Sequence, residues 1–212
     1  MQIKERVFVM RLHKYSDADL IVHCLTSKGA KLSLFARSAL KSKKRFGGGV
    51  FEPTHYIEVL YQKRGGTESG LGASALHSVS EANIIKDFAK LRSDYPRLQL
   101  GLHFVHLVDQ IMREGDEHSS AIFDLLGNAL SSLETSTDLE KLKLHFEVKL
   151  LSNQGVLPIE ASEAQILSLP ISEHPRIELS VDSSRRLRAS IQSVLSEYLP
   201  HARPTKLLHD HV

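Results

Sequence analysis

The chain of 212 residues contains a single cysteine, Cys24, and no tryptophan. One cysteine cannot form a disulfide within the chain or supply a cysteine-based zinc site, and this scarcity favours a reducing compartment. The uncharged apolar runs are shorter than the roughly 18 residues that a membrane helix requires. The segment 1–6 lacks the apolar stretch of a secretory signal. The composition therefore predicts a soluble, cytoplasmic protein without membrane contact.

Sequence patterns of several enzyme classes are also missing. The chain has no Walker loop, no nucleophile elbow and no dinucleotide-binding fingerprint. Asp17 and Asp19 could begin a two-metal nuclease site, but no further carboxylates complete the convergent set that such a site needs. His103 and His106 have a spacing that can ligate a metal, yet their apolar neighbours favour packing inside a helix bundle. We therefore predict no catalytic residue and no metal ligand.

The charges that are present divide the chain into two unlike parts. Residues 1–72 hold 13 Lys and Arg against 6 Asp and Glu, a net charge of +7. The remaining residues hold 14 against 19, a net charge of −5. This asymmetry predicts one half that binds an anion and another half with a different role, although the whole chain carries only +2.

The basic half contains a segment, residues 37–49, that has five cations in nine residues, no acid, and then three glycines. Burying each unpaired charge would cost several kcal/mol or more, so the segment must face solvent or an anionic partner. Glycines let the backbone approach phosphate closely, which favours a nucleic-acid backbone as that partner. The predicted nucleic-acid contacts are Lys31, Arg37, Lys41, Lys43, Lys44 and Arg45, with Lys63 and Arg64 secondary.

Seven of the 13 aromatic residues lie in the first third of the chain. In a protein that binds single strands, some aromatic rings stack on bases while cations follow the backbone. Phe46, beside Arg45 and the glycines, is the predicted stacking residue. Phe35 and Phe51 are predicted to fill the core instead.

The spacing of apolar residues predicts strands in the first part of the chain and helices afterwards. Five short strands with a long basic loop between the third and fourth suit a small closed barrel. The expected strands are 3–9, 19–26, 31–36, 56–61 and 71–79, with a glycine turn at 26–29. The expected helices begin at a capping box in 78–81, at Pro96, at Ala121, at a second capping box in 137–140, and after Asp182. The chain is therefore predicted to be α+β, with a barrel domain at 1–79 and a helical domain at 80–212.

Several segments resemble the RecO family of recombination mediators. The similar segments are 15–22, 25–33, 36–39, 41–48 and 51–53, then 146–151, 155–158 and, weakly, 204–208. The resemblance covers nearly the whole chain in a consistent order. It implies that the barrel is an OB-fold and that a helical domain follows it. Many family members carry a four-cysteine zinc site just after the segment similar to 155–158. Residues 159–181 contain no cysteine, so no zinc is predicted here.

The resemblance also implies a function that needs no catalytic residue. Family members bind single- and double-stranded DNA, anneal complementary strands, and help to load RecA onto DNA coated by single-strand binding protein (SSB). The implied partners are DNA, RecR, the acidic C-terminal tail of SSB and, indirectly, RecA, in the bacterial cytoplasm at the nucleoid. Arg113 or Lys149 would steer the acidic tail into an apolar groove of the helical half.

Two other functions stay open from the residues themselves. The chain could be an RNA-binding OB-fold protein, which a competition between matched DNA and RNA strands would distinguish. It could also be a metal-dependent nuclease that uses Asp17 and Asp19, which cleavage assays with Mg²⁺ or Mn²⁺ would reveal.

Overall fold

The computed structural model describes residues 2–63, 76–112 and 120–198. The chain divides into two compact units, and each is described by itself. The first unit contains residues 1–88 and 111–123, and the second contains residues 89–110 and 124–212. The expected α+β class is confirmed, because a five-stranded sheet is followed by helices.

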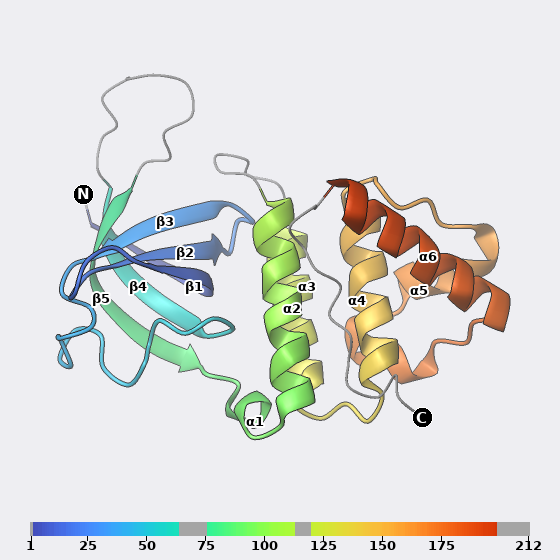
Figure 1. The fold of residues 1–212 in the computed structure, drawn as a ribbon, viewed down its shortest axis with the longest axis horizontal. Helices are drawn as coiled ribbons and strands as arrows, with labels where there is room; N and C mark the ends of the chain where they lie inside the picture. Colours follow the sequence, from blue (N-terminus) through green and yellow to red (C-terminus); the bar gives the residue numbers. More distant parts are fainter. Residues whose placement is uncertain (1, 64–75, 113–119, 199–212) are drawn as a thin grey trace, which may run out of the picture. The chain divides into compact units, whose positions relative to one another are not determined.

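The sheet of the first unit closes into a barrel with the strand order β1-β2-β3-β5-β4 (Figure 1). Strand β1 pairs antiparallel with both β2 and β4, whereas β3 and β5 are joined by a short parallel pairing. The strands are β1 (Gln2–Lys14), β2 (Leu20–Thr26), β3 (Lys31–Ala36), β4 (Tyr56–Gln62) and β5 (His77–Lys86). The four strands predicted before residue 62 are thus confirmed.

Alternating side chains of these strands fill the barrel, as a period of two requires. The turn between β2 and β3 is also as predicted, since Gly29 has φ 77° and its N–H donates to the Thr26 carbonyl at 2.9 Å. The barrel core includes Val7, Val9, Val22, Cys24, Leu34, Ile57 and Val59, all fully buried.

The fifth strand differs from the prediction. Residues 78–81 do not cap a helix, because they lie within β5, where Leu60 of β4 pairs with Glu81. The Ser80 hydroxyl donates to the Leu60 carbonyl at 2.9 Å instead of capping a helix. Residues 71–75 of the expected strand lie outside the described residues. Since β5 reaches Lys86 and the first unit reaches Phe88, the domain boundary expected after residue 79 falls inside this strand.

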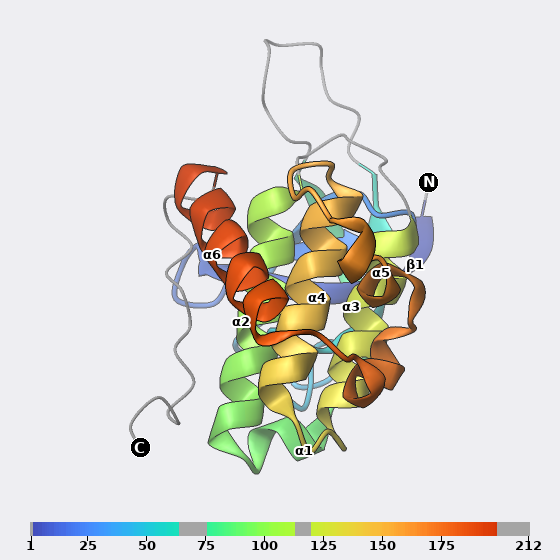
Figure 2. The ribbon, with the colours of Figure 1, turned by 90° about the vertical axis from the view of Figure 1, so that its right-hand side faces the viewer.

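The second unit is built around α4, which contacts α5, α6 and the short helix η2 (Figures 1 and 2). Phe104 and Phe146 stack at its centre, with ring centroids 4.0 Å apart. The helices described are α1 (Ala89–Arg92), α2 (Tyr95–Ile111), α3 (Ser120–Leu133), α4 (Leu139–Asn153), η1 (Ala161–Glu163), α5 (Gln165–Ser168), η2 (Ile171–Arg176) and α6 (Val181–Tyr198).

Two helix caps differ from the prediction by one or two residues. Helix α4 is capped by Asp138, whose carboxylate accepts from the Lys141 N–H at 2.9 Å. Helix α6 begins before Asp182, and the Ser180 hydroxyl accepts from the Ser183 N–H at 3.0 Å. Both positions hold residues whose short side-chain oxygen can reach the first free N–H groups of the helix, so the helices form as expected.

Candidate nucleic-acid interface

The basic segment forms the first half of a long connection between β3 and β4. Hydrogen bonds give it a local fold, since the Ser42 N–H donates to the Ser38 carbonyl at 2.9 Å and the Phe46 N–H to the Ser42 carbonyl at 3.1 Å. The Arg45 carbonyl accepts from the Ala82 N–H of β5 at 3.3 Å. The segment is therefore attached to the barrel through its backbone.

Apolar side chains of the same connection pack inside the barrel. Phe46, Val50 and Phe51 belong to the barrel core, and the rings of Phe46 and Phe51 lie 5.1 Å apart. Only 6% of Phe46 is exposed, so the predicted stacking role of Phe46 is wrong. Burial of the Phe46 ring in the barrel interior stabilises the fold, because it removes apolar surface from water. The core role predicted for Phe51 is confirmed.

The five cations, Arg37, Lys41, Lys43, Lys44 and Arg45, are all exposed. Among the described residues, none of them forms an ion pair with a carboxylate. The Arg45 guanidinium donates to the Ser42 hydroxyl at 3.3 Å and to the Arg37 carbonyl at 3.0 Å, and it lies 5.1 Å from the Phe46 ring centroid. The loop therefore presents a row of cations on a folded backbone; we call residues 37–45 the basic loop.

Asp19 holds the start of the basic loop rather than contributing to a metal site. Its Oδ1 accepts from the Ser38 N–H at 2.7 Å. This backbone hydrogen bond lowers the pKa of Asp19, with a further contribution from the Ser16 hydroxyl. Asp17 is exposed. In residues 2–63, 76–112 and 120–198, no three acidic, histidine or cysteine side chains are grouped so as to hold a metal ion.

The structure separates Lys31 and Lys63 from the basic loop. Both line a pocket of about 840 Å³, together with Lys4, Arg6 and Lys28. Lys31 begins β3 and Arg37 directly follows its last residue, so these two cations lie at opposite ends of the strand, about 20 Å apart. Glu58 in the pocket pairs with Lys4 at 2.7 Å, which leaves an excess of cations there. Arg64 lies outside the described residues.

The two residues proposed for partner binding cannot be compared, because Arg113 also lies outside the described residues. Lys149 of α4 is partly buried, and its Nζ donates to the Leu167 carbonyl of α5 at 2.7 Å. Burial lowers the pKa of Lys149. The Lys149 side chain therefore links α4 to α5 through this hydrogen bond within the second unit.

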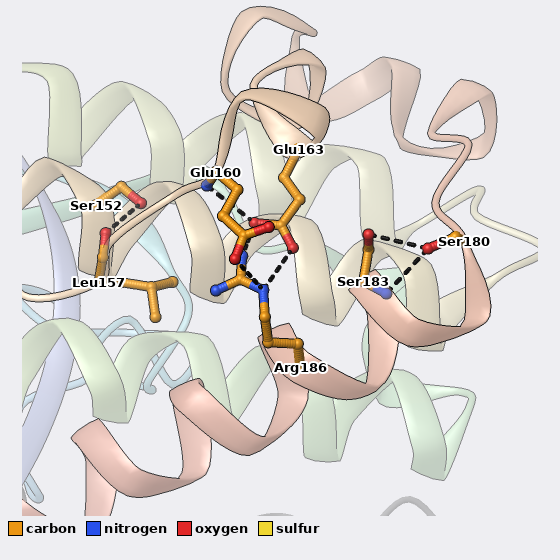
Figure 3. Close-up of polar contacts among 7 residues, drawn as sticks. All are labelled: Ser152, Leu157, Glu160, Glu163, Ser180, Ser183 and Arg186. Atoms are coloured by element: carbon orange, nitrogen blue, oxygen red, sulfur yellow. Dashed lines mark hydrogen bonds and ion pairs between the residues drawn. The ribbon is translucent and has the colours of Figure 1, made fainter.

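The segment 159–181, for which no zinc is predicted, is held by an ion pair. Glu163 is fully buried, and its carboxylate binds the guanidinium of Arg186 from α6 (Figure 3). Glu163 also accepts from the Glu160 N–H at 3.1 Å. The nearby His174 uses both ring nitrogens, one with the Ser136 hydroxyl and one with the Ile171 carbonyl. These donors are already engaged and no thiolate is present, so the residues do not fit a zinc site.

The second unit contains one further buried polar pair. His103 Nε2 lies 2.7 Å from a carboxylate oxygen of Glu147, and both residues are buried. The Glu147 side chain of α4 thus gives His103 of α2 a hydrogen-bond partner. This agrees with the prediction that His103 packs inside a helix bundle. Within the part of the chain that the structure describes, no helix is both long and apolar enough to cross a membrane.

Sequence reasoning missed one aromatic residue near the basic loop. Tyr15 is 64% exposed and meets Phe35 edge to face, with ring centroids 5.5 Å apart. Phe35 is therefore on the outer face of β3, partly covered by Tyr15, and the prediction that it fills the core is wrong. Its neighbour Leu34 points inward, and the position of Phe35 in the alternation of β3 could have shown this.

Comparison with known proteins agrees with this architecture. The family description "Recombination protein O N terminal" matches residues 1–88, and "Recombination protein O C terminal" matches residues 92–166. The chain belongs to the RecO family. The N-terminal match contains the whole barrel and the basic loop, and it ends where the first unit reaches Phe88.

Curated RecO proteins support the same assignment. The chain is 29% identical over 160 residues to the DNA repair protein RecO of Alkaliphilus metalliredigens, and 30% identical over 155 residues to that of Syntrophus aciditrophicus. These alignments cover 74% and 73% of this chain. They cover 60% and 56% of the relatives, so the chain spans somewhat more than half the length of the RecO proteins that it matches.

Proposed function

We propose that this RecO-family chain is a DNA repair and recombination mediator that binds DNA, anneals complementary strands and helps to load RecA onto SSB-coated single strands. The observation that carries the proposal is the row of five exposed cations on the basic loop, none paired with a described carboxylate. The names of the relatives, all DNA repair proteins, support the biological setting.

We further propose that the barrel is an OB-fold. The order β1-β2-β3-β5-β4, with β1 paired to β4 and a parallel β3–β5 pairing, supports this assignment. OB-folds use their outer face and connecting loops to bind oligonucleotides. The basic loop is one of those connections, so its placement agrees with a DNA-binding role.

The mechanism that we propose is electrostatic and needs no bond to be made or broken. Two complementary strands repel each other because each is a polyanion. Cations that neutralise phosphates release condensed counterions and reduce this repulsion. The basic loop and the cation-lined pocket would supply two separate phosphate-binding regions on one barrel.

Partner binding is assigned to the second unit. This unit holds 12 Lys and Arg against 14 Asp and Glu, a net charge of −2, which disfavours DNA binding by the unit alone. We propose that it receives RecR or the acidic tail of SSB, with Lys149 as the residue of this unit to vary first; Arg113, the other candidate, belongs to the first unit. Lys149 variants must be checked for stability, because its Nζ also binds the Leu167 carbonyl.

The salt dependence of DNA binding tests the proposal. If all five loop cations contact phosphates, they contribute about −3.5 to the slope of log K against log salt on single strands. Replacing Arg37, Lys41, Lys43, Lys44 and Arg45 with Ala should therefore flatten that slope by about 3.5 and impair annealing of SSB-coated strands. Fluorescence anisotropy with a labelled oligonucleotide at several salt concentrations gives the slope.

A variant with the same loss of charge elsewhere provides the control. The helical unit offers five exposed cations, Lys90, Arg92, Arg176, Arg185 and Arg188. Their replacement with Ala should leave the slope close to that of the wild type. An unchanged slope in the loop variant would contradict the assignment of the loop, and tighter binding to a matched RNA would favour the RNA-binding alternative.

A further inference from the structure

Tyr15, which directly follows β1, is exposed rather than buried. Elsewhere on the outer face, Phe8 is covered by Tyr56 and Phe123 of the same unit, at ring distances of 5.0 and 4.8 Å. Tyr15 meets the ring of Phe35 in an edge-to-face contact at 87°. Tyr15 is therefore supported by Phe35 while 64% of the residue stays exposed to solvent.

The turn that carries Tyr15 is closed by its own hydrogen bonds. The Tyr15 N–H donates to the Asp19 carbonyl at 3.0 Å, which closes the turn between β1 and β2. Inside this turn the Ser16 hydroxyl accepts from the N–H groups of Ala18 and Asp19 at 3.2 and 3.1 Å. An aromatic ring on such a turn is already oriented, so a ligand that stacks on it loses little affinity to ordering of the protein.

The same turn is bonded directly to the basic loop. The Ser38 N–H donates to Asp19 Oδ1 at 2.7 Å, and the Leu40 N–H donates to the Ala18 carbonyl at 3.0 Å. Tyr15 and the first cations of the loop therefore belong to one hydrogen-bonded assembly. Arg37 and Lys41 directly adjoin Ser38 and Leu40 in the chain, so both cations are attached next to this turn.

We infer that Tyr15, supported by Phe35, is a stacking platform for an unpaired nucleobase and makes this surface select single-stranded over double-stranded nucleic acid. An exposed ring beside a row of cations matches a ligand that alternates flat apolar groups with phosphates. In a duplex the bases are already stacked and their faces are closed, so only the phosphate contacts remain. This inference rests on the proposed DNA-binding function and adds the residue that discriminates between strand forms.

The test compares two tyrosines of equal exposure. Tyr95 of α2 is also 64% exposed but belongs to the second unit. Loss of one base–aromatic stack corresponds to a decrease in single-strand affinity of about 5- to 150-fold, which is expected for Tyr15→Ala. Tyr95→Ala should bind like the wild type, and Tyr15→Phe should retain the affinity because the ring remains. Tyr15→Leu should behave like Tyr15→Ala, which separates stacking from general apolar contact.

Two further measurements make the outcome specific. Binding of Tyr15→Ala to duplex DNA should stay within about twofold of the wild type, and its salt slope on single strands should be unchanged, since no phosphate contact is removed. An oligonucleotide of abasic residues should bind the wild type as weakly as the intact sequence binds Tyr15→Ala. Circular dichroism during thermal unfolding verifies that each variant is folded.

The inference is overturned if Tyr15→Ala binds single strands like the wild type, or if it loses duplex and single-strand affinity equally. Loss of binding to a partner protein with DNA affinity intact would likewise overturn it and would make the ring a protein contact. Failure of the proposed function is distinguishable, because then the wild type itself would bind no DNA or the basic-loop variant would keep its salt slope.

Discussion

At the scale of single residues, Gly47 determines whether the basic loop can adopt its fold. A Cβ atom at Gly47 would lie 2.5 Å from the Lys43 carbonyl oxygen, closer than real Cβ atoms approach backbone. We predict that Gly47→Ala lowers the free energy of unfolding by about 1–3 kcal/mol, since either Lys43 or the buried Phe46 must shift. It should also weaken DNA binding. Urea unfolding and anisotropy measure the two effects.

The neighbouring glycine supplies the matched control. A Cβ atom at Gly48 would meet no surrounding atom within 4 Å, but the φ of this residue is +67°. Alanine at Gly48 therefore costs about 1–2 kcal/mol through backbone strain, and Asn, which tolerates this conformation, should cost less. Asn at Gly47 should gain nothing over Ala. A Gly47→Ala protein as stable as the wild type would contradict the described loop conformation.

Individual residues also show which features of the candidate interface can be predicted from a sequence and which cannot. The cations of the basic loop were predictable because unpaired charge cannot be buried. The roles of Phe46 and Tyr15 were not, because adjacency to cations says nothing about where the barrel interior lies. Phe46 fills that interior, whereas Tyr15 is displayed by a turn whose bonds to Ser38 and Leu40 join segments distant in sequence.

At the scale of elements, local sequence patterns predicted the secondary structure correctly where they were compatible with only one type of element. The first four strands and helices α3 and α4 follow from periodicity and caps. Strand β5 was mistaken at residues 78–81 because Ser-x-x-Glu fits a capping box as well as an alternating strand. Pairing with β4 and β3 decides between the two, and no local signal contains that information.

The link between η1 and α6 leads to a prediction about stability. Arg186→Met should destabilise the protein by about 3–5 kcal/mol, because the fully buried Glu163 carboxylate would lose its partner. Adding Glu163→Leu to that variant should recover much of the loss, since no unpaired charge remains buried. Chemical denaturation followed by circular dichroism gives the free energies.

The adjacent Arg185 is the control for this link. It pairs with Asp182 one turn away on the surface of α6, with side chains 76% and 92% exposed. Arg185→Met should therefore change the free energy of unfolding by less than about 1 kcal/mol. Equal effects of the Arg185 and Arg186 substitutions would show that the ion pair does not hold η1 to α6.

At the scale of the whole molecule, a division of charge was visible in the sequence, but its boundary at residue 72 differs from the boundaries of the structural units. The unit that holds the barrel and the basic segment has 15 Lys and Arg against 11 Asp and Glu, a net charge of +4, whereas the other unit has 12 against 14, a net charge of −2. This difference in charge favours the barrel unit as the DNA-binding part in the function that we propose. A docking surface on the second unit could not be predicted from the sequence, because such a surface depends on packing rather than on composition.

The buried histidines of the second unit give the molecule a pH dependence. Burial, with the charge of Lys149 acting in the same direction, lowers the pKa of His145 to about 4, and burial also lowers the pKa of His174. Histidine in the unfolded chain titrates near 6.5. The stabilising contribution is therefore complete above about pH 6.5. It is lost as the pH falls towards the folded-state pKa, because the unfolded chain takes up protons that the folded unit does not.

We predict that His145 alone reduces the free energy of unfolding by about 2 kcal/mol between pH 6.5 and pH 5.0. His145→Leu should remove that part of the pH dependence, while His106→Leu, at an exposed position of α2, should leave it in place. Urea titrations at half-unit intervals from pH 7.5 to 5.0 measure the slope. If His145→Leu retained the pH dependence of the wild type, the loss of stability at low pH would have to come from groups other than the His145 imidazole. That outcome would contradict this prediction.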